Sequence, residues 1–149
     1  MGDVADPDLG RLLLEAHRAL GAEFVATLAE RGYPDARPGH ATVFLQIDRR
    51  SGTRLTELAK RARITKQGMM LVVDELEERG YVRRIPDPED ARAKVVRLTA
   101  KGRRYVAEAR RATAAIETRA RRELGERRYE TLRGVLEELA GLAVEPETE

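Results

Sequence analysis

The amino-acid sequence predicts a mostly helical protein that carries one small β-hairpin. Apolar residues recur at helical spacing near both ends of the chain, and two short helical stretches joined by a brief turn lie within residues 56–79. Two stretches of alternating character follow at residues 81–85 and 94–98. Two short helices joined in this way form a helix-turn-helix, and the hairpin after them forms a wing. We therefore expect a winged helix-turn-helix head at residues 37–99, with helical regions on both sides of it.

The chain before the motif helices is predicted to begin with one long helix. Asp6 is a suitable N-cap, Pro7 suits the first helical position, and apolar residues then recur every three or four positions until the helix ends near Gly32. This apolar stripe is wider than a single neighbour needs, which is typical of a helix that contacts both a core and a second subunit. After a loop rich in proline and glycine, residues 40–47 are predicted to form a short helix at the centre of the fold.

The helix-turn-helix follows a short strand that is predicted at residues 53–55. Thr56 is expected to cap the first motif helix and Thr65 to cap the second. Gly80 is expected to end the second helix just after Arg79, because glycine readily adopts a left-handed conformation. Four apolar side chains of this second helix share one face and are predicted to be buried: Met69, Val72, Val73 and Leu76.

The chain after the hairpin is predicted to form two helices. Thr99 caps a long, alanine-rich helix, and Gly125 separates it from the last helix. Small residues in the apolar stripe of the long helix allow another helix to approach it closely. We expect residues 6–32 and 100–143 to form a helical dimerisation region, within a single domain that spans residues 1–149.

The composition excludes several classes of protein. Hydrophobic residues make up 42% and charged residues 36% of the 149 positions, which argues against both a disordered chain and a membrane protein. The absence of cysteine excludes a disulfide framework and a thiolate zinc site. The first twenty residues lack the features of a secretory signal, so we expect a cytoplasmic protein with no membrane partner.

The formal net charge of +2 hides an uneven distribution of charge. Residues 49–111 contain 18 lysines and arginines against 9 aspartates and glutamates, whereas the rest of the chain is acidic. A basic central segment between acidic flanks is typical of a nucleic-acid-binding head on an oppositely charged scaffold. The alternative is that these charges belong to ordinary solvated helix faces.

The second motif helix carries candidates for contact with DNA bases at its start and on its exposed face. A helix fits the major groove, which is about 12 Å wide, and its leading turn reaches the base edges. Gln67 can pair with adenine, Lys66 can bind guanine or a phosphate, and Thr65 can bond to either. Met70 or Leu71 can pack against a thymine methyl group. The alternatives are an ordinary solvated helix start and, for Leu71, closure of the core at the edge of the helix.

The tip of the predicted wing, PDPEDARA, places Asp90 two residues before Arg92. An arginine there suits the narrow, electronegative minor groove, and the carboxylate can hold its guanidinium extended. The alternative is a surface ion pair worth less than about 1 kcal/mol. Four basic residues of the two strands are candidate phosphate contacts: Arg83, Arg84, Lys94 and Arg97.

Four motifs follow one another within residues 56–102. They are ELA in the first motif helix, VDELEERGYV leading into the wing, DPEDAR at its tip and LTAKG at the start of the next helix. In this order they resemble the signature of the MarR family of bacterial transcriptional regulators. The resemblance implies a homodimer whose helices interlock while two winged heads read a pseudo-palindromic operator in double-stranded DNA. It also implies a repressor that a small, often aromatic or phenolic, ligand releases from the operator.

Carried to this chain, the resemblance supports the same base-reading candidates on the second motif helix and the same pair at the wing tip. There are departures from the family pattern. Ala91 stands where the family often has a second arginine, Arg63 stands where a glycine is frequent, and Gly68 and Met70 are unusual on a reading helix. These departures bear on the base sequence that is read and not on the mode of binding.

The resemblance further implies that a ligand binds between the head and the dimerisation region. His17, His40 and Phe44 lie on helices that would line such a cleft, and His40 could pair with a carboxylate. The alternative is that the histidines are polar caps or satisfied core residues. We find no residue pattern in the sequence that is typical of catalysis, of a metal site or of a bound cofactor. We therefore expect neither an enzyme nor a cofactor. A second interpretation of the chain is a helical dimer whose basic hairpin docks an acidic protein partner.

Overall fold

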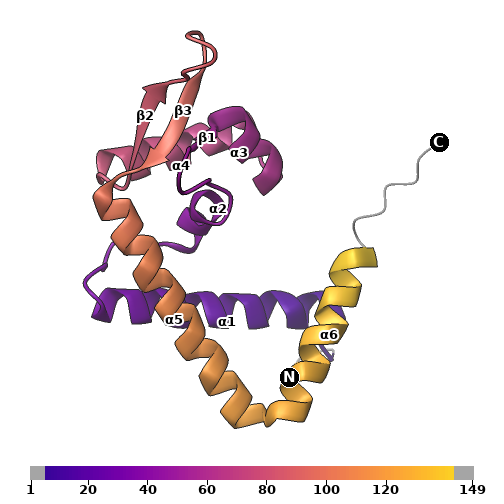
Figure 1. The fold of residues 1–149 in the computed structure, drawn as a ribbon. Coiled ribbons are helices and arrows are strands. Elements are labelled where there is room, and N and C mark those ends of the chain that lie inside the picture. Colours follow the sequence, from indigo (N-terminus) through magenta and orange to yellow (C-terminus); the bar gives the residue numbers. More distant parts are fainter. Residues whose placement is uncertain (1–5, 143–149) are drawn as a thin grey trace, which may run out of the picture. The chain divides into compact units, whose positions relative to one another are not determined.

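The computed structural model of the chain describes residues 6–142, and Figure 1 shows how they form helices and a small sheet. The elements are α1 (Leu9–Glu30), η1 (Pro38–His40), α2 (Ala41–Phe44), β1 (Thr53–Arg54), α3 (Leu55–Ala62), α4 (Lys66–Glu78), β2 (Val82–Pro86), β3 (Lys94–Leu98), α5 (Ala100–Leu124) and α6 (Glu126–Leu142). The chain divides into two compact units, Met1–Ala112 and Thr113–Glu149. The predicted fold class is confirmed. No helix within residues 6–142 is long and apolar enough to cross a membrane.

The first helix, α1, begins two residues later than the sequence predicts. Its N-cap is Asp8, whose carboxylate accepts a hydrogen bond of 2.9 Å from the backbone N–H of Arg11. The prediction of Asp6 as the cap is therefore wrong, because two aspartates stand close together and the second one reaches the free N–H groups of the first turn. The end of the helix agrees with the prediction, since Gly32 follows it with a φ of +96°.

The short central helix is smaller than predicted. A 3₁₀ turn formed by η1 precedes α2, which ends at Phe44 and not at Ile47. One further helical hydrogen bond joins Ile47 N–H to Val43 O over 2.9 Å. The side chain of Asp48 then accepts hydrogen bonds from the backbone N–H groups of Arg50 and Ser51, and this turn stops the helix.

The three strands form an antiparallel sheet in the order β1-β3-β2. The hairpin pairs Val82 with Leu98 and Arg84 with Val96, so that its strands start one residue later than predicted on the β2 side. Tyr81, which was expected in the strand, instead donates its backbone N–H to Leu76 O and so completes the end of α4. The predicted short strand before the motif helices is β1, which pairs with β3.

The two motif helices differ in how well their starts were predicted. Thr65 caps α4 as expected, because its hydroxyl oxygen accepts a hydrogen bond of 3.0 Å from Gly68 N–H. Thr56 does not cap α3. Arg54 is the N-cap, because its backbone is still extended while it pairs with Val95 of β3, and the helix starts directly afterwards. The chain turns between the helices at Arg63, which has a left-handed conformation with a φ of +54°.

The core of the first unit lies beneath α4 and the wing. Met69, Val73 and Leu76 of α4 are fully buried, and Val72 is partly buried beside them. Four aromatic rings pack together in this core, with centroids between 4.6 and 6.4 Å apart: Tyr33, Phe44, Tyr81 and Tyr105. Such pairs add to stability beyond the area that they bury.

The first turn of α5 is locked to the base of the wing. The Thr99 hydroxyl donates to Gly80 O over 2.6 Å and accepts from Gly102 N–H over 3.0 Å, which confirms Thr99 as the predicted cap. A Cβ atom added to Gly102 would overlap the carbonyl oxygen of Tyr81. The LTAKG motif thus places a hydroxyl cap and a residue without a side chain where helix and wing touch.

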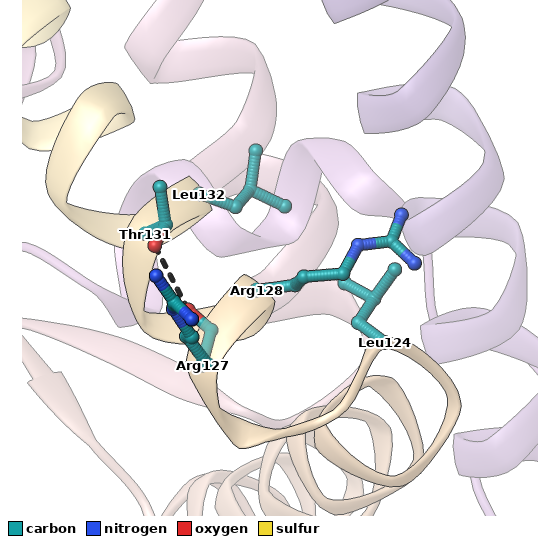
Figure 2. Close-up of a pocket in the computed structure, with 5 residues that line it drawn as sticks. All are labelled: Leu124, Arg127, Arg128, Thr131 and Leu132. Carbon is teal, nitrogen blue, oxygen red and sulfur yellow. Dashed lines mark hydrogen bonds between the residues drawn. The ribbon is translucent and has the colours of Figure 1, made fainter.

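The second unit contains the end of α5 and α6. Gly125 separates them with a φ of +79°, as predicted. Arg121 forms ion pairs with Glu126 and Glu130 and lies over the ring of Tyr129, 4.2 Å from its centroid. A hollow of about 510 Å³ lies near this junction. Figure 2 shows the residues that line it: Leu124, Arg127, Arg128, Thr131 and Leu132.

Candidate nucleic-acid interface

The exposed face of α4 carries the residues that the sequence singled out for base contact. Thr65, Lys66 and Gln67 are exposed at its start. Met70 and Leu71 are 43% and 66% exposed, although both are large and apolar. The alternative that Leu71 closes the core is therefore excluded. Because α4 buries its opposite face, these five side chains are presented together outside the head.

A basic hollow of about 390 Å³ lies between the start of α3, the start of α4 and the wing. It is lined by Arg54, Leu55, Thr56, Lys66, Met70, Arg84, Arg92, Ala93, Lys94 and Val96. Five of these ten described residues are cationic, and no acidic side chain is among them. A concave surface lined by charges of one sign focuses the electrostatic field and attracts counter-ions. Arg54 and Arg84 are paired with carboxylates of the protein, so the charge that is available to an anion comes from the other three cations, Lys66, Arg92 and Lys94.

Arg84 holds the wing to α4. Its guanidinium forms ion pairs with Glu77 and Asp74, and its backbone N–H donates to Glu77 over 2.7 Å. The side chain is only 22% exposed, and its charge is matched by these two carboxylates. Binding a phosphate would require Arg84 to leave both partners, so we expect Arg84 to position the wing and not to contact a phosphate.

Asp87, which is 8% exposed, stabilises the wing tip through two contacts. One of its oxygens accepts from Glu89 N–H, and the other pairs with the Arg54 guanidinium of β1 at 2.5 Å. The Glu89 N–H and, after it, the Arg54 guanidinium hold the pKa of this carboxyl below its usual range. Sequence reasoning missed this pair, because Arg54 stands 33 residues before Asp87 and only the fold brings them together.

The predicted pair at the wing tip lies close together. Asp90 accepts a hydrogen bond of 3.0 Å from the backbone N–H of Arg92 and approaches its Nε at 3.4 Å. The Arg92 side chain is 94% exposed, so its guanidinium is free to reach a partner outside the protein.

The sheet register separates the remaining basic residues of the wing. Lys94 shares the face of Val96 and Arg84, which borders the basic hollow. Arg83 pairs with Arg97 on the other face of the hairpin. The structure therefore brings Lys94 together with the α4 residues and places Arg83 away from them.

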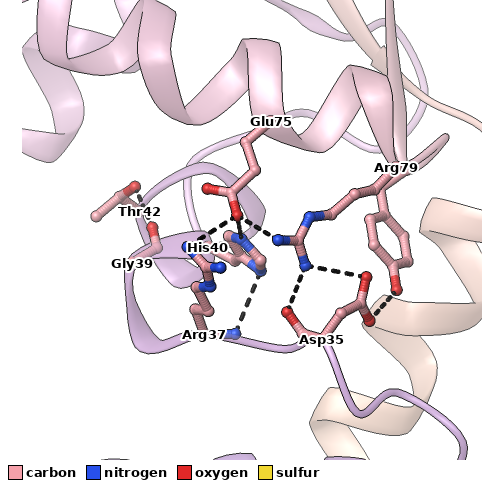
Figure 3. A network of polar contacts seen from close by, with 8 residues as sticks. Asp35, Arg37, Gly39, His40, Thr42, Glu75 and Arg79 are labelled. Carbon is pink, nitrogen blue, oxygen red and sulfur yellow. Dashed lines mark hydrogen bonds and ion pairs between the residues drawn. The ribbon is translucent and has the colours of Figure 1, made fainter.

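The candidate effector residues are not brought together. His17 is exposed on α1, whereas His40 is 2% exposed in the core of the head. Figure 3 shows His40 within a network of polar contacts. Its Nε2 lies 3.5 Å from a Glu75 carboxylate oxygen. Arg37 and Arg79 approach that same oxygen at 3.2 and 2.6 Å. Burial lowers the pKa of His40, and Glu75 opposes this effect only in part.

The network continues to the loop that follows α1. Arg79 binds Asp35 through both its backbone oxygen, at 2.8 Å, and its carboxylate, at 3.1 Å. The Tyr81 hydroxyl donates to the same carboxylate over 3.0 Å, and the pKa of Tyr81 is raised mainly by burial. Phe44 packs against Tyr81 and Tyr105. His40 and Phe44 thus pack among side chains of the head's own core.

The fold and this surface define the class of protein. A helix-turn-helix with an exposed second helix, a basic hollow beside it and an arginine at the tip of a wing is a winged-helix DNA-binding module. Comparison with known proteins shows which of them the chain is similar to. The model of the MarR family matches residues 26–93, and structural similarity extends over most of the chain. The chain is thus similar to the MarR family over the part that includes the helix-turn-helix.

Three solved structures illustrate the similarity. The transcriptional repressor CouR, bound to a 23-mer DNA duplex, is 29% identical with a TM-score of 0.76 over 89% of this chain and 92% of that one. A probable transcriptional regulator from Pseudomonas aeruginosa is 25% identical with a TM-score of 0.75 over 90% and 98%. CouR from Rhodococcus jostii RHA1, bound to p-coumaroyl-CoA, is 24% identical with a TM-score of 0.75 over the whole of both chains. No curated protein sequence matches the chain.

Proposed function

We propose that this protein is a sequence-specific regulator of transcription that binds double-stranded DNA and represses by occupying an operator. The observation that carries the proposal is the basic hollow, which joins the start of α4 to the exposed wing tip. In this arrangement the start of α4 enters the major groove and Arg92 reaches the adjacent minor groove. Lys66 and Lys94 contact the phosphates between the two grooves. The protein acts by binding and not by catalysis, in the cytoplasm where bacterial DNA lies.

A homodimer is part of the proposal. Five leucines of α1 are between 40% and 59% exposed: Leu9, Leu12, Leu13, Leu14 and Leu20. On α6, four apolar residues are between 38% and 48% exposed: Leu132, Val135, Leu136 and Leu139. Large exposed apolar patches mark interaction surfaces. A second copy that covers them gives two heads, which suits a pseudo-palindromic operator with half-sites about one helical turn apart.

We also propose that a small aromatic ligand modulates DNA binding, because a structural relative is bound to p-coumaroyl-CoA. The residues that bind such a ligand stay a prediction. His40 and Phe44 are buried in the head, so a ligand would reach them only by displacing their present neighbours. Binding of p-coumaroyl-CoA to the purified protein, followed by release of a bound duplex, would test this part of the proposal directly.

The central experiment is selection of binding sites from a random duplex library by the purified protein at moderate salt. We expect an enriched pseudo-palindrome with half-sites about ten base pairs apart. Arg92→Ala should then weaken binding to all sequences, whereas Gln67→Ala should relax the preference at one position in each half-site. The matched control is Arg104→Ala, which removes an exposed arginine of α5 outside the proposed surface.

Two outcomes would contradict the proposal. If no sequence is enriched and the affinity changes little with salt, then the basic surface does not bind the phosphates of DNA. If Arg92→Ala and Arg104→Ala weaken binding equally, the wing tip has no role beyond its charge.

A further inference from the structure

The side of α4 opposite the core carries an exposed apolar side chain, Leu71. Met69, Val73 and Leu76 mark the buried side of the helix. At 100° per residue, Gln67 and Leu71 fall on the side directly opposite, one turn apart in a single row. Leu71 is 66% exposed there, so its side chain is available to a partner along most of its length.

One acidic neighbour of Leu71 is already paired. Asp74, which follows it on the same side of the helix, is held by Arg84 of the wing. Lys66 and Met70 lie on the side of α4 that borders the basic hollow. Leu71 is therefore an exposed apolar side chain beside an acidic group that an ion pair already matches.

Only one group in the major groove is suited to such a side chain. Base edges there present hydrogen-bond donors and acceptors, and the sole apolar group is the 5-methyl of thymine. Pressing a leucine against the other edges would cover polar atoms without pairing them, which is unfavourable. The residue one turn earlier, Gln67, can form two hydrogen bonds to adenine.

We infer that Leu71 selects a thymine in each half-site by contact with its 5-methyl group, and that Gln67 reads an adenine within one or two base pairs of it. The spacing follows from the rise of one helical turn, about 5.4 Å, against about 3.4 Å per base pair. This inference rests on the proposed function and adds the chemistry of its specificity: an A·T-rich core in each half-site, with the thymine recognised through its methyl group.

The test replaces thymine by deoxyuridine, which lacks only the methyl group. In the duplex enriched by selection, each thymine is replaced in turn, and the affinity of the wild-type protein is measured at constant salt. We expect one position in each half-site at which the replacement weakens binding about fourfold, as for the loss of one buried methyl group. Leu71→Ala should bind the thymine and deoxyuridine duplexes equally at that position. Leu45→Ala, the control that removes an exposed leucine outside the reading surface, should keep the wild-type difference.

The possible results separate the inference from the proposed function. Sequence-specific binding that is insensitive to deoxyuridine at every thymine, or half-sites without thymine, would overturn the inference and leave the function intact. A Leu71→Ala variant that still prefers thymine at the sensitive position would also overturn it, because another residue would then read the methyl group. Failure to bind DNA specifically would overturn the function and the inference together. Since Leu71 is exposed, thermal unfolding of Leu71→Ala should match the wild type and exclude a folding defect.

Discussion

Adding one methyl group at Gly102 should loosen the wing from α5. Gly102 lies in the first turn of α5, and a Cβ there would overlap the Tyr81 carbonyl oxygen. It would also lie 3.0 Å from the Tyr81 carbonyl carbon and 3.3 Å from Leu98 Cδ2. These neighbours are backbone and core atoms, so no flexible side chain can move aside. The first turn of α5 and the base of the wing must separate in Gly102→Ala.

The expected cost follows from the contacts that such a separation breaks. The Tyr81 carbonyl accepts the Thr99 N–H at 3.0 Å and the Thr99 hydroxyl at 3.1 Å. Forcing extra atoms into a packed site costs about 1–3 kcal/mol, and each weakened hydrogen bond adds about 1 kcal/mol. Alanine is favoured over glycine in a helix by about 1 kcal/mol, which offsets part of this. We expect a net loss of about 2–4 kcal/mol, which lowers Tm by roughly 5–15 °C for a chain of this size.

Thermal unfolding followed by circular dichroism measures the loss, with urea unfolding as an independent estimate of the free energy. The matched control is Gly21→Ala, because the nearest atom to a Cβ there is Pro38 Cγ at 3.9 Å. The control should be unchanged or more stable by up to about 1 kcal/mol. A Gly102→Ala protein that melts within about 2 °C of the wild type would show that the close contact does not constrain the fold.

Two further predictions concern the polar contacts of the head. Because burial lowers the pKa of His40, the unfolded chain binds a proton at this residue more readily than the folded one. The free energy of unfolding should therefore fall as the pH drops below about 6.5, and His40→Gln should show a smaller fall between pH 7.5 and 5.5 in urea unfolding. Arg84→Gln leaves Asp74 and Glu77 without their partner, so it should lose about 1–2 kcal/mol of stability and also weaken operator binding. Arg104→Gln, which removes an exposed arginine of α5 outside the proposed surface, should do neither, and equal effects of the two variants would exclude a positioning role.

Local signals in the sequence predicted the parts of the fold that local chemistry decides. Thr65 and Thr99 cap their helices because a hydroxyl precedes a helical stretch, and Gly125 separates two helices because glycine tolerates a positive φ. The choice between Asp6 and Asp8 failed, because both aspartates carry the same signal and only the geometry of the first turn selects one. Helix starts that depend on strand pairing, as for α3 after β1, carry no local signal at all.

The residues of the candidate site also differ in whether their roles could be predicted from the sequence. The exposed start of α4 and the wing tip could be placed from helical periodicity and turn composition. The role of Arg84 could not, because its two partners are on another element and its charge suggested a phosphate contact. The same holds for Arg54, which is tied to Asp87 through the tertiary fold. The ion pairs must therefore be known before one can decide which basic residues near a DNA-binding motif contact DNA and which stabilise the fold.

The network around Glu75 holds the last turns of α4, so a movement there is expected to displace the first turn. Glu75 and Arg79 fasten the last turns of this helix to the loop after α1, through Arg37, His40 and Asp35. The first turn of α4 lies about 12 Å from that anchor, at 1.5 Å per residue. A tilt of about 5° at the anchor would move the first turn by about 1 Å, which is enough to spoil a bidentate hydrogen bond. A displacement of this loop would therefore shift the first turn of α4, although the loop lies at the other end of the helix.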